Sequence, residues 1–229
     1  MAQERLQKIL SNAGIASRRR AETLILNGQV IVNGKTAKLG DKADLSVDEV
    51  KVNGKKIVAE QKLFYLAVYK PKGYISSRFD PNKRRSVYDL IPADLRAKVW
   101  TIGRLDFFTE GLILFTNDSD LTEQLAHPRY EHDKEYEVLV NKEFTNVQLD
   151  KLRSGVLIGE EKLTSPAKIK VRGDRIYMTI HEGKKRQVRR MFAKVGLKVK
   201  NLKRVRINKL ELGDLPLGKY KSVQKEEII

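Results

Sequence analysis

The chain has 229 residues, of which 41% are hydrophobic and 33% charged, enough for one ordinary domain and a small accessory one. The formal net charge of +17 favours polyanionic partners. The absence of cysteine excludes disulfides and thiolate metal sites. No apolar run approaches the roughly 20 residues that a membrane span needs. The first residues also lack the apolar stretch of a secretory signal. We therefore expect a soluble, cytosolic protein that works without a membrane.

The N-terminal part alternates helix and hairpin signals. Apolar residues recur at helical spacing from Glu4 to Asn12, and Ser17 stands at the N-cap position of a second helix. Asn33-Gly34 and Asn53-Gly54 are the strongest kind of short hairpin signal. These signals predict a compact module of two helices and hairpins over residues 1–60.

Three consecutive arginines follow Ser17, at the start of the second predicted helix. The helix dipole disfavours cations there by a few tenths of a kcal/mol. A phosphate docked at this end would bind both the helix N–H groups and the guanidinium groups. The charge pattern alone leaves a solvated cluster equally open.

The order of motifs in this module is specific. The motifs are Arg5-Leu6-Gln7-Lys8-Ile9-Leu10, Ala16-Ser17-Arg18-Arg19, and Gly28-Gln29-Val30 through Val32-Asn33-Gly34. Together they resemble the small RNA-binding module shared by a small-subunit ribosomal protein and tyrosyl-tRNA synthetases. It implies RNA docking rather than catalysis. The expected docking residues are Arg5, Lys8, Ser17, Arg18, Arg19 and Arg20.

A second, larger domain is expected over residues 61–229, because the pattern loosens around Val58 to Lys62. Strands are predicted at Leu63–Tyr69, Trp100–Ile102, Leu112–Phe115 and Glu135–Val140, with two more within Lys168–Ile180. Helices are predicted from a capping box at Asp120 to near His127-Pro128, over Phe144–Leu152 and over Gln187–Val195. This irregular alternation predicts an α+β fold with a mixed, mainly antiparallel sheet flanked by helices and loops.

Several kinds of site are missing from the sequence. The histidines His127, His132 and His181 lack metal-ligand spacing, and no Gly-x-Ser-x-Gly elbow occurs. Gly34-Lys35-Thr36 is not a phosphate-binding loop, because Gln29 stands where that loop needs glycine. We therefore expect neither a metal nor a cofactor.

Asp106 is the carboxylate that stands out. It lies between Arg104 and Thr109, beside two phenylalanines and just before an apolar strand. Burial there would raise the proton affinity of the acid, whereas an arginine partner would lower it. An ionised carboxylate in a dry pocket could act as a nucleophile. The alternative is a turn aspartate that binds backbone N–H groups.

The stretch from Gly183 to Leu210 is rich in lysine and arginine and has no acidic residue. Positive charges at this density repel one another unless a polyanion lies nearby. Val188, Met191 and Phe192 give the segment an apolar face, so it is a folded surface. This pattern favours RNA contact over a merely solvated face.

Four motifs occur in order along this part of the chain. They are Lys70-Pro71-Lys72-Gly73; Gly103-Arg104-Leu105-Asp106 with Thr109 and Gly111 through Asp118; His127-Pro128-Arg129 with Lys134-Glu135-Tyr136; and Glu182 through Met191. Together they resemble the motifs of the small- and large-subunit rRNA pseudouridine synthases. With the N-terminal module, the resemblance covers essentially the whole chain.

The resemblance implies a role for each matching residue. Asp106 would be the catalytic carboxylate, and Arg189 would be its partner. Tyr136 would be the aromatic that packs on the target uracil and could assist proton removal. Ile180 would be an apolar wall of the pocket. The remaining expected substrate-binding residues are Arg104, Thr109, Lys184, Arg186, Gln187 and Arg190. The pair Phe107-Phe108 departs from the family pattern, where a polar or acidic residue is frequent, and this puts contacts of the loop in doubt.

The function implied is the isomerisation of one uridine in ribosomal RNA to pseudouridine, with large-subunit 23S rRNA favoured over 16S rRNA. The target base would have to be flipped out of its stack. The alternative is a non-catalytic RNA-binding factor in ribosome assembly on the same scaffold. DNA is not expected as a partner, because no recognition helix or dimer signal is present. We expect a monomer.

Overall fold

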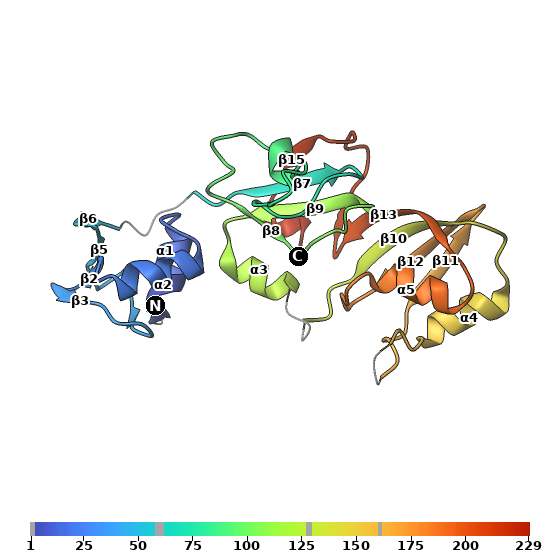
Figure 1. Ribbon diagram of the computed structural model, residues 1–229, viewed down its shortest axis with the longest axis horizontal. Coiled ribbons are helices and arrows are strands. Elements are labelled where there is room, and N and C mark those ends of the chain that lie inside the picture. Colours follow the sequence, from blue (N-terminus) through green and yellow to red (C-terminus); the bar gives the residue numbers. More distant parts are fainter. Residues whose placement is uncertain (1–2, 58–61, 127–129, 160–161) are drawn as a thin grey trace. The chain divides into compact units, whose positions relative to one another are not determined.

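The structure is a computed structural model that describes residues 3–57, 62–126, 130–159 and 162–229. The chain forms two compact units. One contains Met1–Phe64 and Asn117–Ser119, and the other contains Tyr65–Thr116 and Asp120–Ile229 (Figure 1). None of the helices in the described ranges has the length and apolar character to cross a membrane.

The first unit packs two short helices against short strands. Its elements are β1 (Glu4–Arg5), α1 (Leu6–Asn12), α2 (Arg18–Leu26), β2 (Val30–Val32), β3 (Lys35–Thr36), β4 (Lys42–Ala43), β5 (Val50–Val52) and β6 (Lys55–Lys56). The sheet order is β3-β2-β5-β6, and β1 pairs separately with β4. Leu6, Leu10, Ile25 and Val30 are buried together in the core of this unit.

Local sequence signals explain this module well. The Oγ of Ser17 accepts a hydrogen bond from Arg20 N at 3.3 Å, so the predicted N-cap is confirmed. At each Asn-Gly pair both residues have positive φ, 49° and 80° at Asn33-Gly34, as a type I′ hairpin turn requires. The first helix begins at Leu6 rather than Glu4, because Glu4 and Arg5 pair with β4.

The second unit contains the larger sheet and its helices. Its strands are β7 (Tyr65–Lys70), β8 (Trp100–Ile102), β9 (Glu110–Thr116), β10 (Lys134–Val140), β11 (Lys168–Arg172), β12 (Arg175–Ile180), β13 (Val199–Ile207), β14 (Leu210–Glu211) and β15 (Tyr220–Ser222). The helical segments are η1 (Val87–Leu90), α3 (Ser119–Ala126), α4 (Asn146–Ser154), α5 (Gln187–Lys194) and η3 (Lys225–Glu227).

Within the described residues this unit has a nine-stranded sheet with the main order β11-β12-β10-β13-β9-β7-β15. β8 pairs with β9 and β14 pairs with β13. The β13–β9 pair is parallel, and every other pairing recorded in this sheet is antiparallel. The predicted α+β fold with a mixed, mainly antiparallel sheet is therefore confirmed.

Each half of the sheet has its own core. On the β10–β13 half, Tyr136, Val138 and Val140 alternate along β10 and pack with residues of α4 and α5. Figure 1 shows both helices beside this half of the sheet. On the other half, strands β7, β8 and β9 pack with α3 and the C-terminal residues.

The ends of the first predicted helix in this unit differ from the prediction or lie outside the described residues. α3 begins at Ser119, so Asp120 lies in its first turn and is not the N-cap that the sequence predicted. The predicted helix end at His127-Pro128 lies outside the described residues, as do most of the residues around the predicted domain boundary.

Candidate active site

Asp106 lies half-buried in the loop between β8 and β9. The backbone of this loop is held at successive residues. Ser76 Oγ accepts a hydrogen bond from Leu105 N at 3.0 Å and donates one to Leu105 O at 2.8 Å. The carbonyl oxygen of Phe107 accepts a hydrogen bond from Gly73 N at 2.9 Å. Because neighbouring backbone groups are fixed, the loop presents Asp106 in a defined position.

Lys70 is the central support of the loop. It ends β7, and its side chain is fully buried. Its Nζ donates to three carbonyl oxygens, those of Pro71 at 3.0 Å, Asp106 at 3.2 Å and Thr109 at 2.7 Å. The ammonium group therefore holds both ends of the turn that follows Asp106.

Burial lowers the pKa of Lys70 to about 8, with the charge of Arg204 acting in the same direction. The charges of Asp106 and Glu110 act in the opposite direction. The sequence placed Lys70 in a family motif but did not indicate this role. A lysine at the end of an apolar strand was the available signal, and only tertiary contacts show that it is buried.

Arg189 also binds the loop rather than the carboxylate. One of its Nη atoms donates to Phe108 O at 2.8 Å and the other to Val199 O at 3.2 Å. Among the described residues Arg189 has no ion pair within 4 Å, so the expected direct pair with Asp106 is not formed. The physical reason is that the loop and strand carbonyls occupy the two ends of the planar guanidinium.

Arg189 nevertheless interacts electrostatically with Asp106. Burial lowers the pKa of Arg189 and so does the charge of Arg186, whereas the charge of Asp106 raises it. Arg189 therefore attaches α5 to the loop and adds positive potential near the acid.

Tyr136 and Ile180 lie on neighbouring strands in the same hydrophobic cluster as Leu105, the residue before Asp106. Tyr136 is 9% exposed on β10 and lies opposite Met178 of β12, two residues from Ile180 along that strand. The fold thus connects the expected aromatic, the expected apolar wall and the aspartate loop through one packed cluster.

The remaining expected substrate-binding residues have different surroundings. Arg104 is exposed, two residues before Asp106 in the chain. Thr109 is buried, and its Oγ1 has no hydrogen-bond partner among the described residues. Gln187 is buried. Its Oε1 accepts a hydrogen bond from Lys184 N at 2.9 Å, and its Nε2 donates one to Glu182 Oε1 at 2.5 Å, so it shapes the turn before α5.

The basic side chains around α5 also differ from one another. Lys184 Nζ lies 3.7 Å from a carboxylate oxygen of Glu182. Arg190 donates to Lys185 O at 3.2 Å. Arg186 is exposed and adopts a left-handed conformation with φ of 52° immediately before α5.

The expected docking residues lie on the first unit. Arg5 is exposed on β1, and Lys8 bonds Glu4 at 2.6 Å. Ser17 caps α2, and Arg18, Arg19 and Arg20 are exposed in its first turn without an ion pair in the described part of the chain. No cluster of histidine, aspartate and glutamate able to hold a metal ion occurs within the described ranges.

Comparison with known families assigns the class of protein. Residues 64–194 match the RNA pseudouridylate synthase family, and residues 4–49 match the S4 domain. The chain belongs to the RNA pseudouridylate synthases and carries an S4 domain at its N-terminal end. This confirms the resemblance found in the sequence.

Individual relatives are similar along the whole chain. A Bacillus subtilis protein named ribosomal large subunit pseudouridine synthase B is 42% identical, with 98% of this chain and 94% of the relative covered. A Pseudomonas aeruginosa protein of the same name is 38% identical over 98% of this chain and 61% of its own length. A crystal structure of a pseudouridylate synthase superposes with a TM-score of 0.72 at 29% identity, covering 98% of this chain and 97% of the other.

Proposed function

We propose that this protein converts one uridine of large-subunit ribosomal RNA to pseudouridine without a cofactor. The reaction breaks the bond between N1 of uracil and C1′ of ribose, turns the base, and joins C5 to C1′. The proton lost from C5 is balanced by one gained at N1, so the product is an isomer. The names of the Bacillus subtilis and Pseudomonas aeruginosa relatives support the large subunit as target.

Asp106 is the proposed catalytic carboxylate, and its loop is the observation that carries the proposal. Neighbouring residues anchor the loop backbone, yet within the described residues the carboxylate of Asp106 has no ion pair within 4 Å. A half-buried, oriented acid that is not paired is available to react with the nucleotide. A turn aspartate with a purely structural role would instead bind backbone N–H groups with its side chain.

Tyr136 is the proposed platform for the target base. A uracil inside folded RNA has to leave its stack to reach the acid, at a cost of a few kcal/mol. Stacking on an aromatic side chain returns about 1–3 kcal/mol. The cluster that joins Tyr136, Ile180 and Leu105 supports a base site beside Asp106.

The basic groups of the second domain, proposed as residues 61–229, would hold the RNA around this site. Arg189 positions the loop through Phe108 and adds positive potential. The proposed basic contacts to substrate are Arg104, Lys184, Arg186 and Arg190. The buried Thr109 and Gln187 would support the substrate site from beneath, through the aspartate loop and the turn before α5. The first domain, proposed as residues 1–60, would dock rRNA through the arginines at the start of α2. There the exposed guanidinium groups and the helix N–H groups could bind the same phosphate.

The test of this proposal is the variant Asp106→Asn. We expect it to abolish pseudouridine formation and to leave the affinity for rRNA nearly unchanged, because the amide keeps the shape of the side chain but not its nucleophilicity. Pseudouridines mapped in rRNA from cells that carry either form identify the target. Asp214→Asn, an exposed carboxylate in a turn, is the control. Wild-type conversion by Asp106→Asn contradicts the proposed mechanism.

A further inference from the structure

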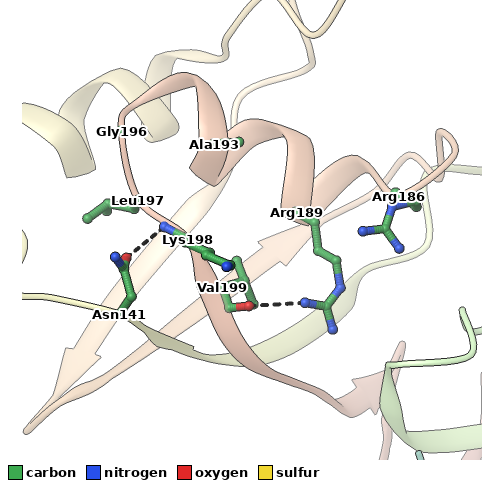
Figure 2. Close-up of a pocket in the computed structure, with 8 residues that line it drawn as sticks. All are labelled: Asn141, Arg186, Arg189, Ala193, Gly196, Leu197, Lys198 and Val199. Atoms are coloured by element: carbon green, nitrogen blue, oxygen red, sulfur yellow. Dashed lines mark hydrogen bonds between the residues drawn. The ribbon is translucent and has the colours of Figure 1, made fainter. Parts of the chain in front are cut away.

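A surface cavity of about 410 Å³, wide open to solvent, lies between α5 and the start of β13, next to the end of β10. Figure 2 shows its lining residues, with Asn141, Lys198, Arg189 and Arg186 following one another across the view. Asn141 and Lys198 fix one end, because Lys198 N donates to Asn141 Oδ1 at 2.8 Å and Asn141 N donates to Lys198 O at 3.0 Å. These two bonds hold Asn141 and Lys198 together at this end of the cavity.

The lining of this cavity has charges of one sign. Arg186, Arg189 and Lys198 contribute three cations, and none of the described residues that line the cavity is acidic. In the part of the chain that the structure describes, none of the three forms an ion pair within 4 Å. The charge of Arg186 is one cause of the lowered pKa of Arg189, so the two guanidinium groups repel each other. An anion between these side chains would relieve that repulsion.

Arg189 joins this cavity to the aspartate loop. The guanidinium that lines the cavity is the same group that donates to Phe108 O, two residues after Asp106. Its Nε is buried and has no hydrogen-bond acceptor among the described residues. An anion held in the cavity would thus lie one side chain away from the loop that presents the proposed catalytic acid.

We propose that the cavity binds a phosphodiester group of the RNA strand that carries the target uridine. The proposal rests on the proposed function, which brings an RNA strand to the loop that Arg189 holds. The exposed guanidinium of Arg186 can bind phosphate oxygens as a fork, and the exposed Lys198 adds a compact charge. Arg189, whose two Nη atoms already donate to carbonyl oxygens, contributes its positive charge. The sequence did not indicate Asn141, and it indicated Lys198 only as one basic residue of the stretch from Gly183 to Leu210. In this proposal both become part of one phosphate site.

The test is a thermodynamic cycle that combines a protein variant with an RNA in which one phosphate charge is removed, and it measures whether their effects on affinity add. Lys198→Met removes the charge and keeps the unbranched stem of the side chain. Stem-loop RNAs that contain the target uridine each receive a single methylphosphonate linkage, placed in turn at positions around that uridine. We expect one linkage to lower the affinity of the wild-type protein about tenfold, as for loss of one hydrogen-bonded charge contact. At that linkage Lys198→Met should have little further effect, because the two changes remove one contact.

The control is Lys142→Met, an exposed lysine next to Asn141 that does not line the cavity. The loss of affinity caused by Lys142→Met should add to the loss caused by each methylphosphonate linkage. Arg186→Asn, which tolerates the left-handed backbone, should couple to the same linkage as Lys198→Met. Additive effects of Lys198→Met at every linkage overturn the proposal.

The readout separates this proposal from the proposed function. Dissociation constants are measured without turnover, so the cycle gives its answer whether or not the RNA is converted. Pseudouridine formation by the wild-type protein on the unmodified stem-loop is scored separately. Conversion without coupling overturns the phosphate site alone, whereas coupling without conversion overturns the enzymatic function alone.

Discussion

Three residues have different proposed roles in the site. Asp106 is the acid, Tyr136 is the platform for the base, and Lys70 supports the loop. Asp106 is exposed enough to meet a nucleotide, whereas Lys70 is fully buried beneath the same loop. Tyr136 belongs to the hydrophobic core and, in the proposed function, also to the substrate site. Variants of these residues can therefore be chosen so that an effect on folding stability is measured separately from an effect on RNA binding or turnover.

Tyr136→Leu tests stacking separately from core packing. Leucine keeps an apolar side chain in the cluster but cannot stack on uracil. We expect turnover on a minimal stem-loop to fall about tenfold to a hundredfold, since stacking contributes about 1–3 kcal/mol. Tyr136→Phe keeps the ring, so it should bind RNA as the wild type does. Single-turnover rates and melting temperatures of both variants are the measurements. Equal rates for Tyr136→Leu and the wild type would falsify the stacking role.

Lys70 predicts how stability depends on pH. Its pKa of about 8 in the folded protein is below the ordinary value of 10.5, so the unfolded chain binds more protons between these values. The contribution of Lys70 to the free energy of unfolding is therefore lowest below pH 8, and it increases as the pH rises toward 10.5. Between pH 8 and 10 the wild type should gain about 2 kcal/mol relative to Lys70→Met.

Urea unfolding at a series of pH values measures this difference. Lys72→Met, an exposed lysine in the same motif, is the control and should follow the wild type throughout. Parallel pH profiles for the wild type and Lys70→Met contradict the lowered pKa.

The parallel contact between β9 and β13 is the element on which the site depends. It joins the half of the sheet that carries the aspartate loop to the half that carries Tyr136. Gly111 lies opposite Arg204 in this pair, with φ of 119°. A Cβ atom at position 111 would overlap the backbone of Arg204. The glycine therefore allows the two strands to approach.

Gly111→Ala should destabilise the protein by about 3 kcal/mol or more, because it combines a backbone clash with a strained φ. Thermal unfolding of the purified variant checks this expectation. Gly183→Ala is the matched control, since its φ is not in the left-handed region and no described atom lies within 4 Å of the added Cβ. A melting temperature of Gly111→Ala equal to that of Gly183→Ala would show that the strands can separate at no cost.

At the scale of the whole molecule, the chain combines a small unit with exposed arginines and a larger unit with the proposed acid. The net charge of +17 favours a polyanion as the common partner of both. The proposed division of labour, docking by the first and chemistry by the second, predicts that the two can be impaired separately.

The triple change Arg18→Gln, Arg19→Gln and Arg20→Gln should weaken binding to long rRNA and lower its salt dependence, by about 0.7–0.9 in the slope for each lost phosphate contact. Turnover on a minimal stem-loop at saturation should stay at the wild-type value. Binding titrations at several salt concentrations and single-turnover rates measure the two effects. Replacing Lys35, Lys38 and Lys55 by glutamine removes the same charge from the same unit as a control. Equal loss by both triple variants refutes specific docking through α2.

Local patterns predicted most elements of this fold, for identifiable reasons. Ser17 caps α2 and the Asn-Gly pairs turn the hairpins because their conformations depend on neighbouring residues alone. The alternation along β10 likewise predicted a strand. The motifs around Asp106 were sufficient to identify the family, which the comparisons confirmed.

Contacts between residues distant in the sequence determined the rest. Arg189 binds Phe108 O rather than the carboxylate of Asp106, because packing of α5 decides which acceptors its guanidinium reaches. The burial of Lys70 likewise follows from the loop carbonyls that surround it, 36 and 39 residues further along the chain. By itself the sequence determined the kind of fold, the family and the proposed acid, since these follow from short-range order and motif content. Only the tertiary structure decided which groups hold that acid in place, because hydrogen bonds and burial depend on distances that the linear order of residues does not contain.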